Sequence, residues 1–197
     1  MVNVKVAAVA VVAAAALSVA GCSSSTTSDA PKNKTMNKDG VSYEYPDSWN
    51  EITDLKTGSQ TGNQKWQQAV GQTTTNLAII SSYQVGVTVT EQNLAELEPQ
   101  IVETIGNLAK QSSGTVTSPV KTEQTAGFPG FTAEVAVKSP SGADLQSTLW
   151  LFFDGNNEYF LNCQAQAGQQ AQMQPGCNTI RQTFKVTQTA SASPSPS

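Results

Sequence analysis

The sequence of 197 residues contains no histidine and only one arginine, Arg181. Without histidine there can be no Ser-His-Asp or Cys-His nucleophilic site, and no zinc site built on imidazole ligands. The lysines are scattered, so the chain lacks the basic clusters that displace counterions from nucleic acid. It also lacks sets of guanidinium groups that clamp phosphate or carboxylate ligands. We therefore expect neither a nucleic-acid-binding protein nor a histidine-dependent enzyme.

Charge of either sign is sparse. Charged residues make up 13% of the chain, and 15 acidic against 11 basic residues give a net charge of −4. Gln, Thr, Ser and Ala are abundant instead, a composition that is common in secreted proteins. The chain has no P-loop and no glycine-rich dinucleotide motif. We expect no cofactor.

The first 21 residues have the pattern of an export signal. Lys5 precedes the apolar run 6–17, which is too short and too rich in alanine for a membrane-spanning helix. The run leads into Leu17-Ser18-Val19-Ala20-Gly21-Cys22, which resembles the lipobox of bacterial lipoproteins. The resemblance implies cleavage before Cys22 and attachment of palmitate-type acyl chains to that cysteine, enough for stable anchoring. The alternative is an ordinary secretory signal, with Cys22 as a chance thiol.

The composition divides the chain into four parts. Residues 1–21 are the predicted signal peptide, and residues 22–39 are the acylated cysteine with a flexible tether rich in Ser and Thr. Residues 40–186 form one folded domain, and residues 187–197 form a disordered Ser/Pro tail. Treated as a coil, the tether would hold the domain about 20–25 Å from its anchor.

Inside the domain, the apolar period alternates between two, which is typical of strands, and 3.6, which is typical of helices. Strands are predicted near 41–45, 65–70, 77–85, 116–125, 131–138, 145–153 and 159–165, with a short return strand at Ile52. The Asp154–Asn157 turn between the last two predicts a hairpin.

Two helices are predicted between and after these strands. The first follows from an apolar stripe with spacings of three and four, Leu94, Leu97, Ile101, Ile105 and Leu108. Thr90 is its predicted N-cap and Gly114 its end, and Pro99 should either kink the helix or lie in the first turn of a new one. The second helix carries Cys177, Ile180 and Phe184 on one face. This order predicts an α+β fold, an α/β/α sandwich with a mostly antiparallel sheet flanked by helices.

The two remaining cysteines fit this arrangement. Cys163 shares a strand face with Leu161, and Cys177 shares a helix face with Ile180. If that helix covers that face of the sheet, the sulfurs can meet, and they would oxidise outside the cytoplasm. Acylation of Cys22 leaves an even pair, so we predict a Cys163–Cys177 disulfide. The alternative is two buried free thiols.

The segment from Gly40 to Trp49, Gly-Val-Ser-Tyr-Glu-Tyr-Pro-Asp-Ser-Trp, resembles the opening of PsbP-like domains, an aromatic strand followed by Pro-x-x-Trp. The long helix after Val85, the turn at 126–130, the Asp-Gly hairpin and the final helix at 180–184 agree with this resemblance. With the lipobox and the paired cysteines, the chain resembles the LpqN-type lipoproteins of actinobacteria. The resemblance implies an α/β/α sandwich around an antiparallel sheet, a location in the cell envelope and a non-enzymatic role in binding or assembly. It carries no catalytic residues over to this chain.

Acidic residues offer two candidate sites. Glu44, Glu134 and Asp144 are candidates for the carboxylate pair of a hydrolase, although solvated charges on strand faces explain them better. The segment Asp154–Glu158 has approximately the spacing of a calcium loop, but a hairpin turn explains it and no later bidentate Glu follows. We therefore predict no catalytic residues and no metal site.

Aromatic and amide residues offer two more. Trp49, Trp66 and Trp150 are candidates for lining a ligand cleft, although packing in the core is the more common role of such residues. The Gln-rich run 164–174 is a candidate contact surface, although a solvated strand end and loop explains it better.

The combined expectation is a non-catalytic binding or assembly module of the cell envelope, anchored at the extracytoplasmic face of the cell membrane. Its expected partners are the membrane, through the lipid on Cys22, and another envelope protein. The alternative is a carrier of a small molecule, lipid or glycan, which needs a cavity of roughly several hundred Å³ inside the sandwich.

Overall fold

A computed structural model of the chain describes residues 32–53, 63–139 and 142–187. The predicted leader, Cys22 and the first part of the predicted tether lie outside these ranges, as does nearly all of the predicted tail. The helices within the described ranges are too short or too polar to cross a membrane.

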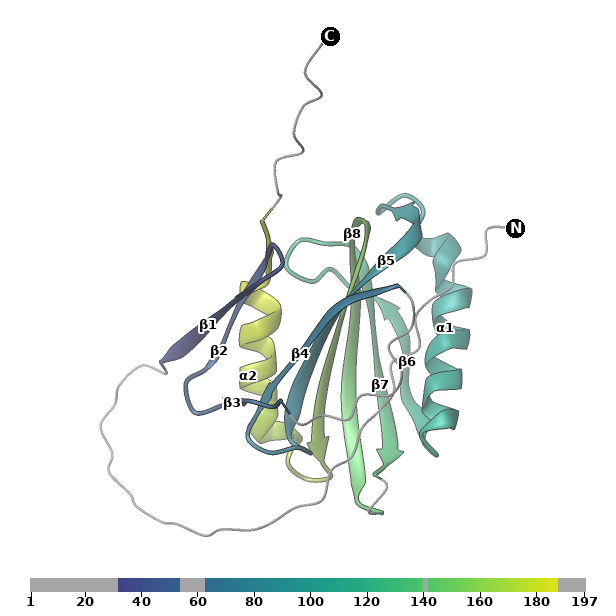
Figure 1. Cartoon of the computed structure of the whole chain (residues 1–197). Helices are drawn as coiled ribbons and strands as arrows, with labels where there is room; N and C mark the ends of the chain where they lie inside the picture. The colour runs from purple at the N-terminus through teal and green to yellow at the C-terminus, as the bar shows by residue number, and fades with distance from the viewer. Residues whose placement is uncertain (1–31, 54–62, 140–141, 188–197) are drawn as a thin grey trace, which may run out of the picture.

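An antiparallel sheet forms the middle layer of the domain (Figure 1). Its strand order is β3–β4–β5–β8–β7–β6, with bounds β3 (Asn50–Glu51), β4 (Gln64–Gly71), β5 (Leu77–Val89), β6 (Thr115–Thr122), β7 (Gly130–Lys138) and β8 (Asp144–Gln166). Helix α1 (Leu94–Gln111) covers one face. The other face carries α2 (Gln170–Thr183) and a small sheet of β1 (Asn33–Lys38), β2 (Val41–Pro46) and β9 (Lys185–Val186). The predicted fold class, an α/β/α sandwich with antiparallel strands, is confirmed.

Strand β8 is a hairpin in itself. Its first arm pairs with β7 and its second arm pairs with β5. The N–H of Ala167 donates to the carbonyl of Asp144 at 3.0 Å, so the two ends of the hairpin lie side by side. The chain reverses at Gly155, whose φ of 58° belongs to the left-handed region. The predicted Asp-Gly hairpin is therefore present, at the centre of the sheet.

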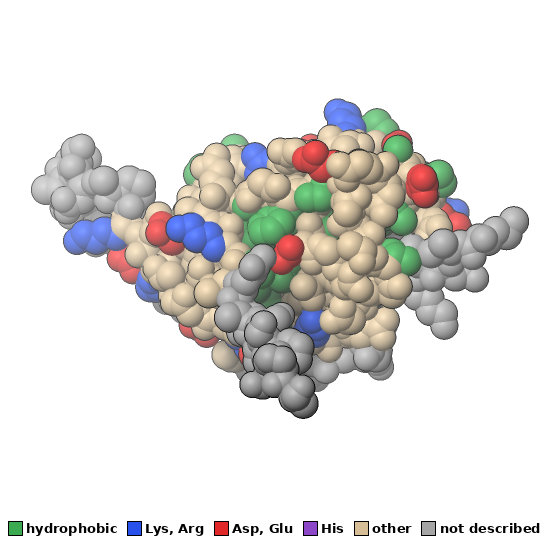
Figure 2. Space-filling model, turned by 90° about the horizontal axis from the view of Figure 1, so that it is seen from above, with side chains coloured by type: hydrophobic (Ala, Val, Ile, Leu, Met, Phe, Trp, Pro, Cys, Tyr) green, Lys and Arg blue, Asp and Glu red, His purple; other side chains and the backbone are tan. Residues whose placement is uncertain are grey.

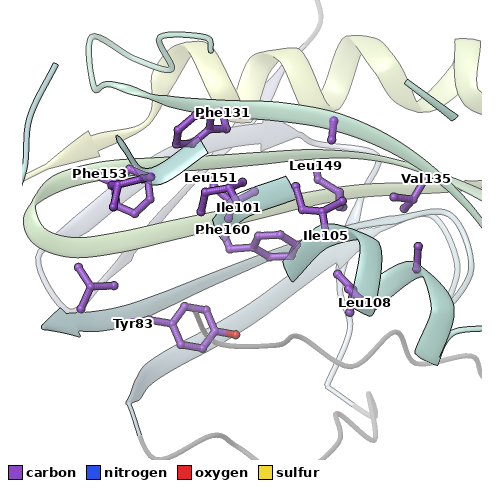
Figure 3. Close-up of a cluster of buried hydrophobic side chains, with 14 of the residues drawn as sticks. Tyr83, Ile101, Ile105, Leu108, Phe131, Val135, Leu149, Leu151, Phe153 and Phe160 are labelled. Carbon is purple, nitrogen blue, oxygen red and sulfur yellow. The ribbon is translucent and has the colours of Figure 1, made fainter. Parts of the chain in front are cut away.

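The first apolar layer lies between α1 and the sheet. Every residue of the predicted stripe on α1 is buried. The stripe packs against residues of β7 and β8 (Figure 3), among them Phe131, Leu149, Leu151, Phe153 and Phe160. This layer fixes α1 over the β6–β7 side of the sheet.

Both predicted limits of α1 shift by a few residues. The helix begins after Asn93 rather than Thr90, and it ends at Gln111, where Ser113 takes a φ of 51° before Gly114. Pro99 lies inside one continuous helix, so it does not begin a new one. Ala95 and Pro99 are both exposed, so water can solvate the carbonyl that the missing N–H of Pro99 leaves without a donor.

The second apolar layer, between α2, the small sheet and the other sheet face, is rich in aromatic rings. Phe184, at the end of α2, lies at the centre of this layer. Its ring meets the rings of Phe152 and Tyr159 edge-on, with ring centroids 4.8 Å and 5.0 Å apart. Its ring also stacks on the ring of Tyr43, with centroids 6.4 Å apart. Such pairs add about 0.5–1.5 kcal/mol each beyond the area they bury. The end of α2 is therefore held by rings from two sheets.

The small sheet corrects the predicted tether. Asn33–Lys38, expected to be flexible, forms β1 and pairs with β2 along its whole length. Met36 is the only apolar residue of β1, so the strand shows no hydrophobic alternation. It is held instead by backbone pairing and by Lys34, whose ammonium group donates to the carbonyl of Trp49 at 2.9 Å. Thr187, expected in the tail, donates its N–H to the carbonyl of Gly40 at 2.6 Å.

Helix α2 corrects the expectation for the Gln-rich run. The helix begins at Gln170, so residues 170–174 form its first turns rather than a loop. Met173 is buried and extends the stripe of Cys177 and Ile180 by one turn. A single apolar residue among glutamines gave too short a stripe to reveal this turn.

Candidate functional site

The sulfur atoms of Cys163 and Cys177 are bonded, with an S–S distance of 2.01 Å and Cα atoms 6.0 Å apart. Cys163 lies on β8, on the sheet face that α2 covers, and Cys177 lies on the inner side of α2. These are the two faces that the sequence pattern brings together. Cys177 is fully buried and Cys163 is 6% exposed, so the bridge ties α2 to β8 in the middle of the sheet.

The three carboxylates considered for hydrolysis do not converge. Glu44, on the small sheet, accepts a hydrogen bond from Asn33 at 3.1 Å. Asp144 pairs with Lys138 at 2.6 Å, and Glu134 is exposed on β7. Each is a solvated charge on a strand.

The Asp154–Glu158 segment does not gather its oxygens either. Neighbouring residues of a strand point to opposite faces, so Glu158 lies on the α1 side while Tyr159 lies on the α2 side. Within the described ranges, no three His, Cys, Asp or Glu side chains lie together as metal ligands would. The segment acts as a hairpin turn.

A narrow groove of about 290 Å³ lies beside the disulfide. Cys163, Ala165 and Met173 lie at its base, and its rim is polar, with Thr117, Glu134, Gln146, Thr148, Gln170 and Gln174. Part of the Gln-rich run therefore borders a groove.

A larger depression of about 760 Å³, called the end hollow below, opens at the other end of α2. It lies between the β1–β2 turn, the start of β4, the start of the second arm of β8 and the end of β9. Its lining comprises Asp39, Gly40, Lys65, Trp66, Ser82, Asp154, Asn157, Tyr159, Val186 and Thr187. Figure 2 looks onto this end of the molecule and shows hydrophobic side chains among acidic, basic and neutral polar groups.

The β1–β2 turn shapes one wall of the end hollow. Asp39 and Gly40 have φ values of 50° and 78°, as the two central residues of a type I′ hairpin turn require. A β-carbon at Gly40 would lie 3.2 Å from the carbonyl oxygen of Thr187. Glycine thus lets the β1–β2 turn lie close to Thr187, just after β9.

Three nearly buried side chains form the base of the end hollow, and their polar atoms make no hydrogen bond to other described side chains. Trp66, Ser82 and Tyr159 are 7%, 2% and 4% exposed. None of them hydrogen-bonds through its side chain to another described residue. Burial, followed by the nearby Asp154, raises the pKa of Tyr159 to about 12. Its hydroxyl therefore keeps its proton and remains a donor at neutral pH.

Of the three tryptophans considered for a cleft, Trp66 alone lines the end hollow. Trp49 packs against α2, and Trp150 lies under the guanidinium of Arg181, 5.5 Å from its ring centre. Arg181 also pairs with Glu123. Trp66 was predictable from the sequence as a candidate, but no sequence pattern predicts that Ser82 and Tyr159 lie beside it.

One buried acid stands apart from both depressions. Glu158 is 1% exposed, and its Oε2 has no hydrogen-bond partner among the described residues. It lies opposite Tyr83 in the register of β8 and β5. Burial raises the pKa of Glu158 to about 7.

The arrangement of layers and strands defines a PsbP-like α+β sandwich. The particular solved structure that supports this is cyanobacterial PsbP (CyanoP) from Synechocystis, with a TM-score of 0.56, 12% identity, and coverage of 83% of this chain and 98% of that one. A Bacteroides thetaiotaomicron protein is similar at a TM-score of 0.50 and 14% identity, over 77% of this chain. The match spans less than half of that protein, 47%.

LpqN of Mycobacterium tuberculosis, described as involved in cell envelope biogenesis, is similar at a TM-score of 0.49 and 8% identity, over 81% of this chain and 92% of LpqN. At these identities the likenesses concern the fold. No protein-family model matches the chain, and no curated protein matches it by sequence.

Proposed function

We propose that the protein is a non-catalytic binding or assembly module of the cell envelope, held at the extracytoplasmic face of the cell membrane by a lipid on Cys22. The observation that carries the proposal is the end hollow, where nearly buried side chains hold unused hydrogen-bonding atoms. Among the described residues no hydrogen bond joins the hydroxyl of Ser82 or Tyr159 to a base, and Lys65 donates to Asn157 instead. Such a surface is suited to holding a partner rather than to transforming one.

The anchoring part of the proposal rests on the lipobox-like segment that ends at Cys22. Because β1 begins at Asn33, the tether is shorter than the sequence indicated. A chain of ten residues reaches at most about 35 Å. The folded domain would therefore stay close to the membrane surface.

The carrier alternative finds less support. A lipid held inside the sandwich needs an apolar cavity, whereas side chains fill the layers on both sheet faces. The groove beside the disulfide and the end hollow both have polar rims. These features favour binding at the surface.

Site-specific photo-crosslinking in the native envelope tests the proposal. A crosslinker at exposed Asp39, on the rim of the end hollow, should capture a defined envelope component. The same group at exposed Glu103, on α1, is the matched control. Mass spectrometry of captured proteins and extracted lipids would identify the component. Identical products from the two positions, or turnover in a broad hydrolase screen, would contradict the proposal.

A further inference from the structure

We infer that the end hollow binds a neutral saccharide, with Trp66, Ser82 and Tyr159 as hydrogen-bond donors at its base. The inference rests on the proposed binding function and deepens it by naming the class of ligand.

The base of the end hollow offers donors. The indole of Trp66 only donates, and the hydroxyls of Ser82 and Tyr159 donate or accept. None of these three side chains has a hydrogen-bond partner among the described residues, and their polar atoms are not fully enclosed, so a ligand in the hollow can reach them. A ligand with several acceptor oxygens would satisfy them together.

The rim of the end hollow offers acceptors. Asp39 and Asp154 are carboxylates, which only accept when ionised. The ligand must therefore carry donors on one side and acceptors on the other. Hydroxyl groups are both, and a saccharide presents several of them on a rigid ring, next to C–H faces that can contact Trp66 and Tyr159.

Charge argues against ionic ligands. The lining has two carboxylates against one ammonium group, that of Lys65, and Lys65 already donates to Asn157 Oδ1 at 2.7 Å. A phosphate or uronate would face net negative charge. An ammonium group would suit the carboxylates, but it offers no acceptor to the indole N–H of Trp66. A neutral ligand fits both halves of the site.

The position of the end hollow indicates which saccharide source it would face. Strand β1 begins where the chain arrives from the anchor and ends at the turn that lines the hollow. Six residues of strand span roughly 17–20 Å. Figure 1 shows this turn at the same end of the molecule as the β8 turn. The hollow thus lies at the opposite end of β1 from Asn33, so anchoring through Cys22 would favour envelope polysaccharide over membrane headgroups as the source of the saccharide.

Titration of the full chain in detergent micelles with three hexasaccharides tests the inference. The neutral probes are maltohexaose and chitohexaose, and the anionic probe of equal length is hexagalacturonate. We expect saturable binding of at least one neutral probe by calorimetry. The double substitution Ser82→Ala with Tyr159→Phe should weaken it at least about tenfold, since two hydrogen bonds are lost.

Tyr43→Phe is the matched control, because Tyr43 lies in the same aromatic layer with a buried hydroxyl outside the end hollow. It should leave the affinity unchanged. The inference is overturned by no saturable binding of either neutral probe at millimolar concentration, by preference for hexagalacturonate, or by equal loss in Tyr43→Phe. Capture of an envelope component at Asp39 without saccharide binding would contradict the saccharide as the ligand, but it would still support the proposed binding function.

Discussion

The indole ring of Trp49 lies directly against the backbone of α2 at Gly176. A β-carbon at Gly176 would lie 2.6 Å from Cη2 of Trp49 and 2.9 Å from Cγ of Pro46, closer than atoms pack. The Pro-x-x-Trp segment, which begins at the last residue of β2, therefore packs onto the middle of α2. Glycine inside a helix costs about 1 kcal/mol relative to alanine, and this close approach explains why it stands there.

Gly176→Ala should destabilise the protein by about 1–3 kcal/mol, because the added methyl group overlaps Trp49. Gly106→Ala in α1 is the matched control, since its β-carbon would meet no atom within 4 Å. The control should stabilise by about 0.5–1 kcal/mol through helix propensity. Urea unfolding measures both changes. Stabilisation by Gly176→Ala would show that Trp49 does not pack this closely.

Loss of the Cys163–Cys177 bridge should lower the free energy of unfolding by about 2–4 kcal/mol, the amount expected for closing a loop of about 15 residues. The double substitution to serine, or reduction, should loosen α2 before the sheet in hydrogen exchange. Intact mass after alkylation without reduction decides whether the exported protein carries the bridge. Addition of two alkyl groups before reduction would rule the bridge out.

Stability should fall as pH rises from about 4.5 to 7. Burial raises the pKa of Glu158 from 4.5 to about 7, so the folded state holds a proton that the unfolded state releases in this range. The full penalty, present above pH 7, is roughly 3 kcal/mol. Glu158→Gln should remove this component, whereas Glu134→Gln, at an exposed position, should not. Parallel pH profiles of wild type and Glu158→Gln in chemical unfolding would contradict the assignment.

Cys22→Ala should release the protein from the membrane fraction or leave it unprocessed, since the thiol that accepts the acyl chains is missing. Cys177→Ser serves as the control and should remain membrane-associated. Fractionation followed by mass measurement of the N-terminal peptide reports both outcomes. Equal membrane association of wild type and Cys22→Ala would refute acyl anchoring.

The elements that the sequence predicted well are those whose apolar residues recur at the period of the element. The stripe from Leu94 to Leu108 predicted α1, and the alternation of Val41, Tyr43 and Tyr45 predicted β2. The sequence did not predict strand β1, because Met36 is its single apolar residue and its order comes from pairing with β2. The hydrophobic pattern of a single segment does not predict pairing of this kind.

The end hollow was missed for a related reason. Its lining comes from β4, β5, β8, the β1–β2 turn and the end of β9, so it exists only once distant strands have paired. Trp66 can be recognised from the sequence as one of three tryptophans that could line a ligand cleft. Ser82 is ordinary in sequence, and only its burial at the base of the hollow gives it a role.

The meeting of β2 with β9 has a consequence for the order in which the chain becomes native. Val41 pairs with Val186, and the N–H of Glu44 donates at 2.8 Å to the hydroxyl of Thr183, 139 positions later. During synthesis or export, Val41 and Glu44 emerge long before their partners Val186 and Thr183. The inner edge of β2 thus stays open, and the aromatic layer incomplete, until the last residues of the domain emerge. Folding of this side is obligately late, and chains that stop short of Thr183 would expose the layer to aggregation and proteolysis.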